Sequence, residues 1–156
     1  MTEVRFPPRR IDLEALVGLL VKEHAVMRDG LQRAKEAAAR RDFTELSKEL
    51  KRLDPVFRQH IADEESQVLR LLIDHLGVEG ASDEIRVFQQ HRPIYQLMKR
   101  VTELAAKPAA ELEEDQAKLD ALFEGHTLAE EQRVFPRAML VKEQGHPHGP
   151  DASPAS

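Results

Sequence analysis

Apolar residues recur at intervals of three and four along most of the chain, which is the spacing of helices that each bury one face. Four stretches carry this pattern, at about residues 11–40, 43–76, 83–106 and 110–142. Residues that end helices separate the stretches, at Arg41-Asp42, Gly77 to Gly80 and Lys107-Pro108. Connections this short place neighbouring helices antiparallel. The sequence therefore predicts an all-α protein, an up-down-up-down antiparallel four-helix bundle.

Three residues mark expected local features of these helices. Pro55 lies inside the second stretch, and Asp54-Pro55 is a candidate cap and first-turn proline of a broken second helix. Pro93 is expected to kink the third helix, because proline lacks the N–H that an interior position needs. Ser82 is the expected N-cap of that helix.

The two ends of the chain lack the helical pattern. We expect residues 1–10 to form an irregular N-terminal arm, 11–144 the helical domain, and 145–156 a disordered tail rich in proline, glycine and serine. The first ten residues contain no continuous apolar segment typical of a secretory signal, and no stretch approaches the length of a membrane span. We therefore expect a cytoplasmic protein without membrane association.

Composition narrows the chemistry. The chain of 156 residues has 23 basic and 28 acidic side chains, and its net charge of −5 argues against nucleic-acid binding through a basic face. It has no cysteine, which excludes disulfides, thiolate zinc sites, iron–sulfur clusters and a cysteine nucleophile. It does have seven histidines, and their positions are informative.

Each apolar stripe carries one histidine near its middle. The polar residues on the four stripes are His24, then His60 and Glu64, then His91 and Tyr95, then His126 and Glu130. A histidine and a glutamate four residues apart lie about 40° apart around a helix axis, so both side chains can converge on one internal point. The stripes around them include Leu20, Phe57, Phe88 and Leu122, an apolar seam expected to exclude water.

A metal site explains these buried polar residues best. An ionised carboxylate alone in an apolar seam would cost several kcal/mol and would protonate instead. Two carboxylates beside four imidazoles are stabilised best by cations, and six or seven nitrogen and oxygen ligands without sulfur suit iron or manganese, two ions more readily than one. The carboxylates would bridge the metals and the imidazoles would cap the ends. The competing interpretation is a polar core network without metal.

The remaining titratable residues of interest are expected elsewhere. Glu65 and Glu131 follow the two stripe glutamates and are expected beside the stripe, on the surface or behind the ligands. His75 lies near the end of the second helix, as a helix C-terminal cation or an exposed side chain. His146 and His148 belong to the tail.

The order H…HxxxE…H…HxxxE over four helices resembles the hemerythrin-like, or HHE cation-binding, domain family. The resemblance is carried by KEHAVM, RQHIADEESQVL, FQQHRPIY and EGHTLAEEQRVFP, and spans about residues 11–142. It implies two iron ions (Fe2+/Fe3+), with an oxo or hydroxo bridge among the options. Glu64 and Glu130 would bridge them, with His24 and His60 on one iron and His91 and His126 on the other.

The sequence departs from the oxygen-carrying members of that family. They have a fifth histidine one turn after the third, where this chain has Tyr95, and an HxxxxD string where this chain has His126 and Glu130. Tyr95 is the only tyrosine; it is a candidate iron ligand, a hydrogen-bond donor to a bound oxygen species, or a core aromatic. Ferritin-type ExxH pairs are disfavoured, because that spacing occurs only at Glu143 and His146.

Three functions are compatible with these residues. The first is binding of O2 or NO in the bundle core, for sensing, storage or scavenging. The second is an enzyme that acts on peroxide or NO, favoured by Tyr95. The third is iron handling or repair. The expected partner is thus O2 or another small diatomic or peroxide ligand, while the sequence identifies no protein partner, and manganese or a mixed pair fits the same ligands.

Overall fold

The computed structural model describes residues 7–106 and 110–144, and in these ranges all regular structure is helical, without a strand. The elements are α1 (Leu13–Ala39), α2 (Phe43–Asp63), η1 (Glu64–Leu69), α3 (Arg70–Gly80), α4 (Ser82–Gln89), α5 (His91–Ala106), α6 (Glu111–Ala129), η2 (Glu130–Val134) and α7 (Phe135–Gln144). The all-α prediction is confirmed. The predicted tail, with His146 and His148, lies outside the described residues.

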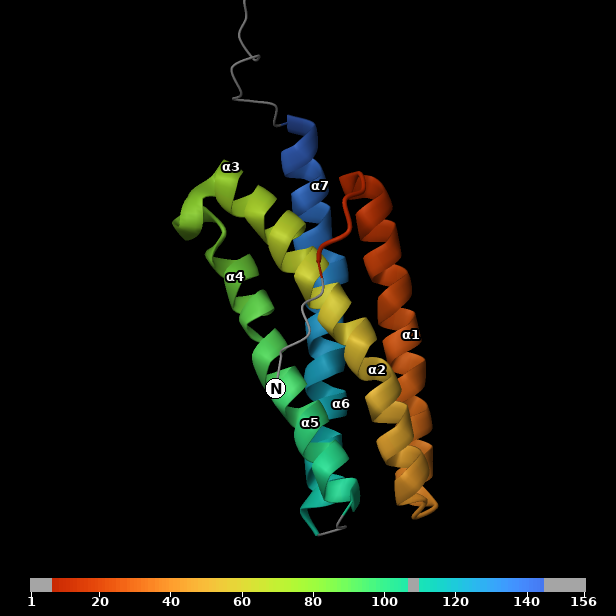
Figure 1. Ribbon diagram of the computed structural model, residues 1–156. Helices are drawn as coiled ribbons and strands as arrows, with labels where there is room; N and C mark the ends of the chain where they lie inside the picture. Colours follow the sequence, from red (N-terminus) through yellow and green to blue (C-terminus); the bar gives the residue numbers. More distant parts are fainter. Residues whose placement is uncertain (1–6, 107–109, 145–156) are drawn as a thin grey trace, which may run out of the picture.

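The helices pack side by side as a bundle. Helix α1 packs against α2, α2 against α5, and α5 against α6, while α1 also contacts α6. At the other end of the bundle α3 packs against α7 (Figure 1). None of the helices in the described part of the chain combines the length and apolarity that crossing a membrane requires.

Two aspartates begin the first two helices. The Asp12 carboxylate accepts a hydrogen bond from the Ala15 N–H, and the Asp42 carboxylate accepts one from the Glu45 N–H. Arg41 has a φ of 59°, the left-handed conformation that commonly ends a helix. The predicted break at Arg41-Asp42 is therefore confirmed.

The predicted break at Gly77 to Gly80 is confirmed, whereas the one at Lys107-Pro108 lies outside the described residues. Gly77 has a φ of 75°, which glycine adopts without strain, and it kinks the chain within α3, near the C-terminal end of that helix. The third stretch is interrupted at Gln90, between α4 and α5, close to the predicted kink at Pro93. Proline there has no N–H to offer the carbonyl of Gln89, so the helical ladder fails at this point.

Two local predictions are wrong. Helix α2 continues through Pro55 without a break, so Asp54 is not a cap. Leu53 and Phe57 on either side of this proline are 3% and 1% exposed, and their packing holds the helix together. The N-cap of α4 is Ala81 and not Ser82, because Ala81 is fully buried and its carbonyl accepts the N–H of Ile85.

The apolar core consists of two clusters. One includes Met27, Phe57, Ile94 and Phe123, and the other includes Leu20, Val68, Phe88 and Val134. The predicted seam residue Leu122 is only partly buried, whereas its neighbour Phe123 is 3% exposed. At this point of α6 the core is therefore filled by Phe123 and not by Leu122. On each of the four long helical stretches the seam histidine lies between residues of the two clusters, so polar side chains separate them.

Helices α1 and α2 approach closely at Gly30. A Cβ atom built on Gly30 would lie 2.6 Å from Leu53 Cδ2. We expect Gly30→Val to lower the free energy of unfolding by about 1–3 kcal/mol through overpacking, measured by urea denaturation. The matched control is Gly18→Val, because a Cβ there meets nothing within 4 Å. Equal stability of the two variants would contradict the close approach.

Candidate metal centre

Six buried side chains from the four long helical stretches meet in the middle of the bundle. His24 comes from α1, His60 from α2, His91 is the first residue of α5 and His126 lies in α6, while Glu64 and Glu130 begin η1 and η2. None of the six is more than 3% exposed. The structure thus brings together all six residues of the predicted HxxxE pattern.

The six residues form two groups that share both carboxylates. One group consists of His24, His60, Glu64 and Glu130, and the other of Glu64, His91, His126 and Glu130. In each group the ligand atoms lie within 4.8 Å of one another. Each group can hold a metal ion with two imidazoles and two carboxylates.

Each carboxylate extends one oxygen toward each group. For Glu64, Oε2 lies 3.1 Å from His60 Nε2, and Oε1 lies 2.8 Å from His91 Nε2. For Glu130, Oε1 lies 2.8 Å from His24 Nε2, and Oε2 lies 3.1 Å from His126 Nε2. This is the orientation in which a carboxylate can bridge two metal ions.

Most of these short distances are not hydrogen bonds. Within the described residues, both Glu64 oxygens, Glu130 Oε2, and the Nε2 atoms of His91 and His126 are buried without a hydrogen-bond partner. In the other group, His24 Nε2 and His60 Nε2 face each other at 3.2 Å. Buried polar atoms that lack a partner carry a large free-energy cost, and a cation at each group would bind these atoms directly.

A second set of polar side chains fixes the outer nitrogen of each histidine. The Nδ1 atoms of His24, His60, His91 and His126 lie 2.7, 3.0, 2.9 and 3.0 Å from the side-chain oxygens of Glu131, Glu23, Glu65 and Gln90. A carboxylate or amide oxygen accepts the Nδ1–H, which leaves the Nε2 lone pair for a metal. The expectation that Glu65 and Glu131 lie beside the stripe is confirmed.

The roles of Glu23 and Gln90 are not predicted by the helical stripes. Each residue immediately precedes a seam histidine in the sequence, but its side chain bonds the histidine of a different helix. Glu65 and Glu131, which immediately follow the seam glutamates, do the same. Their position next to a ligand in the sequence could have indicated that these four residues support the site. Which histidine each one bonds depends on how the helices pack.

Both ligand glutamates begin a π-helical segment. Glu64 opens η1 and Glu130 opens η2, and each caps the preceding α-helix with its N–H bonded to the carbonyl of its own HxxxE histidine. Single π-helical turns are rare and occur often at functional sites. Each segment turns the Glu-Glu pair so that the first carboxylate faces the centre while the second reaches a histidine of another helix. The sequence periodicity does not reveal this.

Tyr95 and His75 lie apart from the two groups. The Tyr95 hydroxyl is hydrogen-bonded to the Arg58 guanidinium, and its ring stacks on Phe57 with centroids 6.5 Å apart. Three roles are expected for Tyr95, and its contacts in the structure are those of the third, an aromatic residue that packs against the core. His75 is exposed, and its Nδ1 donates to the Leu71 carbonyl at 3.0 Å.

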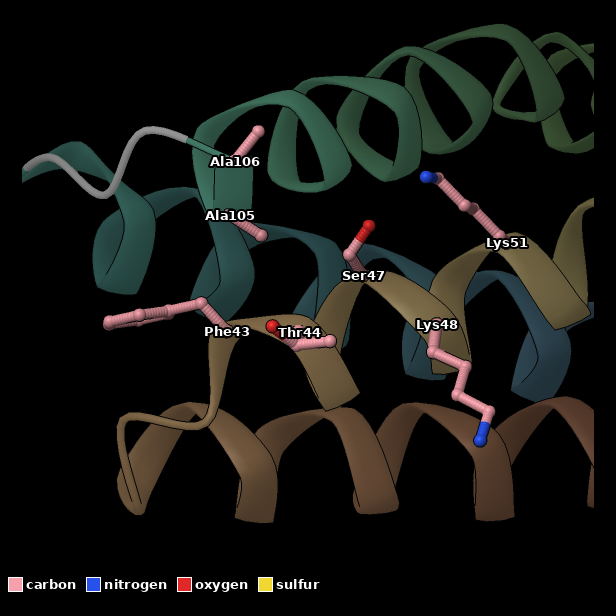
Figure 2. A pocket seen from close by; sticks show the side chains of 7 residues that line it. All are labelled: Phe43, Thr44, Ser47, Lys48, Lys51, Ala105 and Ala106. Carbon is pink, nitrogen blue, oxygen red and sulfur yellow. The ribbon is translucent and has the colours of Figure 1, made fainter.

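Two open pockets lie between α2 and α5. The larger, of about 560 Å³, is formed by Phe43, Thr44, Ser47, Lys48, Lys51, Ala105 and Ala106 (Figure 2). Figure 2 shows Lys48 and Lys51 pointing away from each other. Phe43 and Lys51 lie 17 and nine residues before His60 on one helix, so this pocket extends from about 14 to about 25 Å along the axis from that histidine. The second, of about 310 Å³, includes Arg58 and Tyr95.

The charges of the centre shift its pKa values strongly. Burial by itself lowers the pKa of His60, but Glu64, Glu130 and Glu23 outweigh it and raise that pKa well above its ordinary value. Burial also lowers the pKa of His91. Glu130, Glu64 and Glu65 outweigh that effect and raise this pKa well above its ordinary value. Burial raises the pKa of Glu130, but the four imidazoles that surround its carboxylate lower it well below the usual range.

No protein-family model, no curated protein and no solved structure matches the chain. The family resemblance therefore stands on the residues themselves.

The raised pKa values predict that metal binding competes with protons. Because a metal must displace the protons that the raised pKa values hold on His60 and His91, binding should release protons, and the metal affinity should rise as the pH rises above 6.5. Isothermal titration calorimetry in two buffers of different ionisation enthalpy measures the release. An affinity independent of pH would contradict the assignment.

The same shifts fix the pH dependence of the metal-free protein. The contribution of His60 and His91 to stability is complete below pH 6.5 and is lost as the pH rises through their folded-state pKa values. The contribution of Glu130 is present above pH 4.5 and is lost on acidification. The melting temperature of the metal-free chain should therefore fall above neutral pH.

Proposed function

We propose that the protein is a hemerythrin-like, non-haem di-iron protein that binds O2 or NO in the core of an up-down-up-down antiparallel bundle. The supporting observation is the pair of buried groups that share Glu64 and Glu130. A single cation in the His24–His60 group would leave the Nε2 atoms of His91 and His126 without a ligand or a hydrogen bond. Two cations bind all six side chains.

The donor set favours iron. Imidazole nitrogen and carboxylate oxygen, without sulfur, suit iron or manganese, and two histidines with a carboxylate form the type of site in which ferrous iron reacts with oxygen. Each group supplies two imidazoles and one oxygen from each shared glutamate. Iron commonly takes more ligands than these four, so a small molecule can bind to the metal directly. A bound pair would supply electrons to that molecule.

The chain's own residues orient the ligands and exclude water. The four Nδ1 partners hold the imidazole rings in one tautomer. Phe57 meets His91 edge-on with centroids 6.3 Å apart, while Phe88 and Phe135 stack on His91 and His24. These apolar contacts admit small uncharged molecules more readily than ions, because a charged species would lose its hydration there. That property supports O2 or NO as the ligand.

Two other functions use the same centre. An enzyme that turns over peroxide or NO would gain from Tyr95, which packs on Phe57 between the centre and the pocket beside Arg58. An iron-handling or repair protein would hold its metal loosely. We place both behind O2 or NO binding, because the Tyr95 hydroxyl is engaged by Arg58.

The proposal is tested by metal content and spectroscopy. Anaerobic loading with Fe2+ should give two iron ions per chain, and the reduced protein should develop a visible absorption with O2 that disappears when O2 is removed. Turnover of peroxide above that of free iron would favour the enzyme instead. Less than one iron per chain under all loading conditions would exclude the di-iron proposal. Tyr95→Phe should leave the iron content unchanged.

Stability should depend on metal through the ligands. A metal that binds only the folded state adds about 2.7 kcal/mol at a free concentration one hundred times its dissociation constant. We expect His60→Ala and Glu64→Ala to lose iron and to lose the metal-dependent part of the melting temperature, measured calorimetrically with and without Fe2+. His75→Ala is the matched control, since His75 lies outside both groups. Wild-type melting unaffected by iron would contradict the site.

A further inference from the structure

Residues 7–10, the part of the N-terminal arm that the structure describes, contribute a charged residue that lies behind the metal centre. Arg9 precedes the first helix, and its side chain reaches two acidic residues on different helices (Figure 1 shows the arm running up to α1). Its Nη2 donates to Glu23 Oε2 on α1 at 2.7 Å, and its Nε donates to Asp63 Oδ2 on α2 at 2.7 Å. The Arg9 backbone N–H donates to Asp63 Oδ1, also at 2.7 Å.

Both partners of Arg9 are placed next to ligands of one metal group. Glu23 directly precedes His24, and Asp63 directly precedes Glu64. The second oxygen of Glu23, Oε1, accepts from His60 Nδ1 at 3.0 Å. Arg9 is thus linked to three of the four ligands of the His24–His60 group and, within the described residues, makes no contact with His91 or His126.

The arm is held in this position by side chains spaced four residues apart. Gln59 donates to the Pro7 carbonyl at 2.8 Å and to Asp63 Oδ1 at 3.2 Å, and Gln67 donates to the Arg9 carbonyl. Gln59, Asp63 and Gln67 therefore form one row along α2 and η1. These contacts hold the backbone at Pro7 and Arg9, so the Arg9 guanidinium is kept where it can bond Glu23 and Asp63 together.

The charge of Arg9 also distinguishes Glu23 from the other carboxylates behind the centre. The side chains of Glu65 and Glu131 are 48% and 34% exposed, and in residues 7–106 and 110–144 neither pairs with an arginine or lysine. Glu23 is only 13% exposed and Asp63 is fully buried. Without the guanidinium, two buried carboxylates would face each other, and Glu23 would turn toward water and away from His60.

We propose that Arg9 is a positioning residue for the metal ion between His24 and His60, which makes the N-terminal arm part of the metal centre. The guanidinium holds the Glu23 carboxylate in place, and that carboxylate in turn orients the His60 ring. The hydrogen bond to Asp63 holds the residue next to Glu64, the start of η1, against the same guanidinium. The link through Glu23 and His60 belongs to one metal position, whereas Glu64 is shared, so the role falls mainly on the position between His24 and His60. This inference rests on the di-metal function proposed above.

The test is the anaerobic binding of Fe2+, followed by competition with a coloured chelator. Arg9→Met should weaken one of the two binding steps about ten-fold or more, the size of effect seen when a group behind a metal ligand is removed, and should weaken the other step clearly less. Arg9→Lys keeps the positive charge but lacks the planar guanidinium that donates to Glu23 and Asp63 together, and it should restore part of the affinity. Arg10→Met is the matched control, because Arg10 is exposed.

Paired variants identify the affected position. In a His126→Ala chain the remaining ion lies at the His24–His60 group, and there Arg9→Met should weaken it. In a His60→Ala chain the remaining ion lies at the His91–His126 group, and there Arg9→Met should have a clearly smaller effect. Glu23→Gln in the wild-type chain should weaken the same step as Arg9→Met. Circular dichroism of each metal-free variant reports whether its helices are intact.

The possible results separate this inference from the proposed function. A wild-type chain that binds fewer than two ions would contradict the di-metal function. A wild-type chain that binds two, with identical affinities in Arg9→Met, would contradict the role of Arg9 alone. Tighter binding in Arg9→Met would also overturn it, because the guanidinium would then act only as a positive charge that repels the metal. Equal weakening of both steps would overturn it as well, because Arg9 would then not act mainly on the position between His24 and His60.

Discussion

The structure depends on a layer of six buried, ionisable side chains that divides the apolar core in two. Each of the four long helical stretches passes from one apolar cluster to the other and presents one histidine at the crossing, and two of the stretches add a glutamate. Such a layer would cost the fold several kcal/mol if its charges and lone pairs had no partners. The neighbouring carboxylates raise the pKa values of His60 and His91, and protons held on these imidazoles satisfy the layer in part. Metal ions would satisfy it completely, so folding and metal binding are coupled at this layer.

The geometry around the layer serves to hold its six side chains. The two π-helical segments begin at Glu64 and Glu130 and direct the neighbouring Glu65 and Glu131 to histidines of other helices. Each imidazole is then held from two sides, by a shared carboxylate at Nε2 and by an oxygen at Nδ1. This arrangement links every helix that carries a ligand to another, so displacement of one helix would disturb ligands on its neighbours.

Much of this arrangement is predictable from the sequence. Helical spacing places His24, His60, His91 and His126 on buried faces, and the two HxxxE strings place the glutamates beside them, because helix periodicity alone determines which residues share a face. The contacts between helices are not predictable in this way. Glu23, Gln90 and Arg9 act on histidines or acids of other segments, and the unbroken α2 at Pro55 depends on packing that outweighs the local preference of proline. The role of Tyr95 also escapes the pattern, because its position on a stripe does not reveal that Arg58 engages its hydroxyl.

The central claim is that two metal ions lie between the histidine pairs and share Glu64 and Glu130. Anomalous diffraction at the iron edge from crystals of the iron-loaded protein tests it most directly. The account predicts two peaks about 3.5–4 Å apart, one between His24 and His60 and the other between His91 and His126. A single peak, or peaks only at other histidines of the chain, would contradict it.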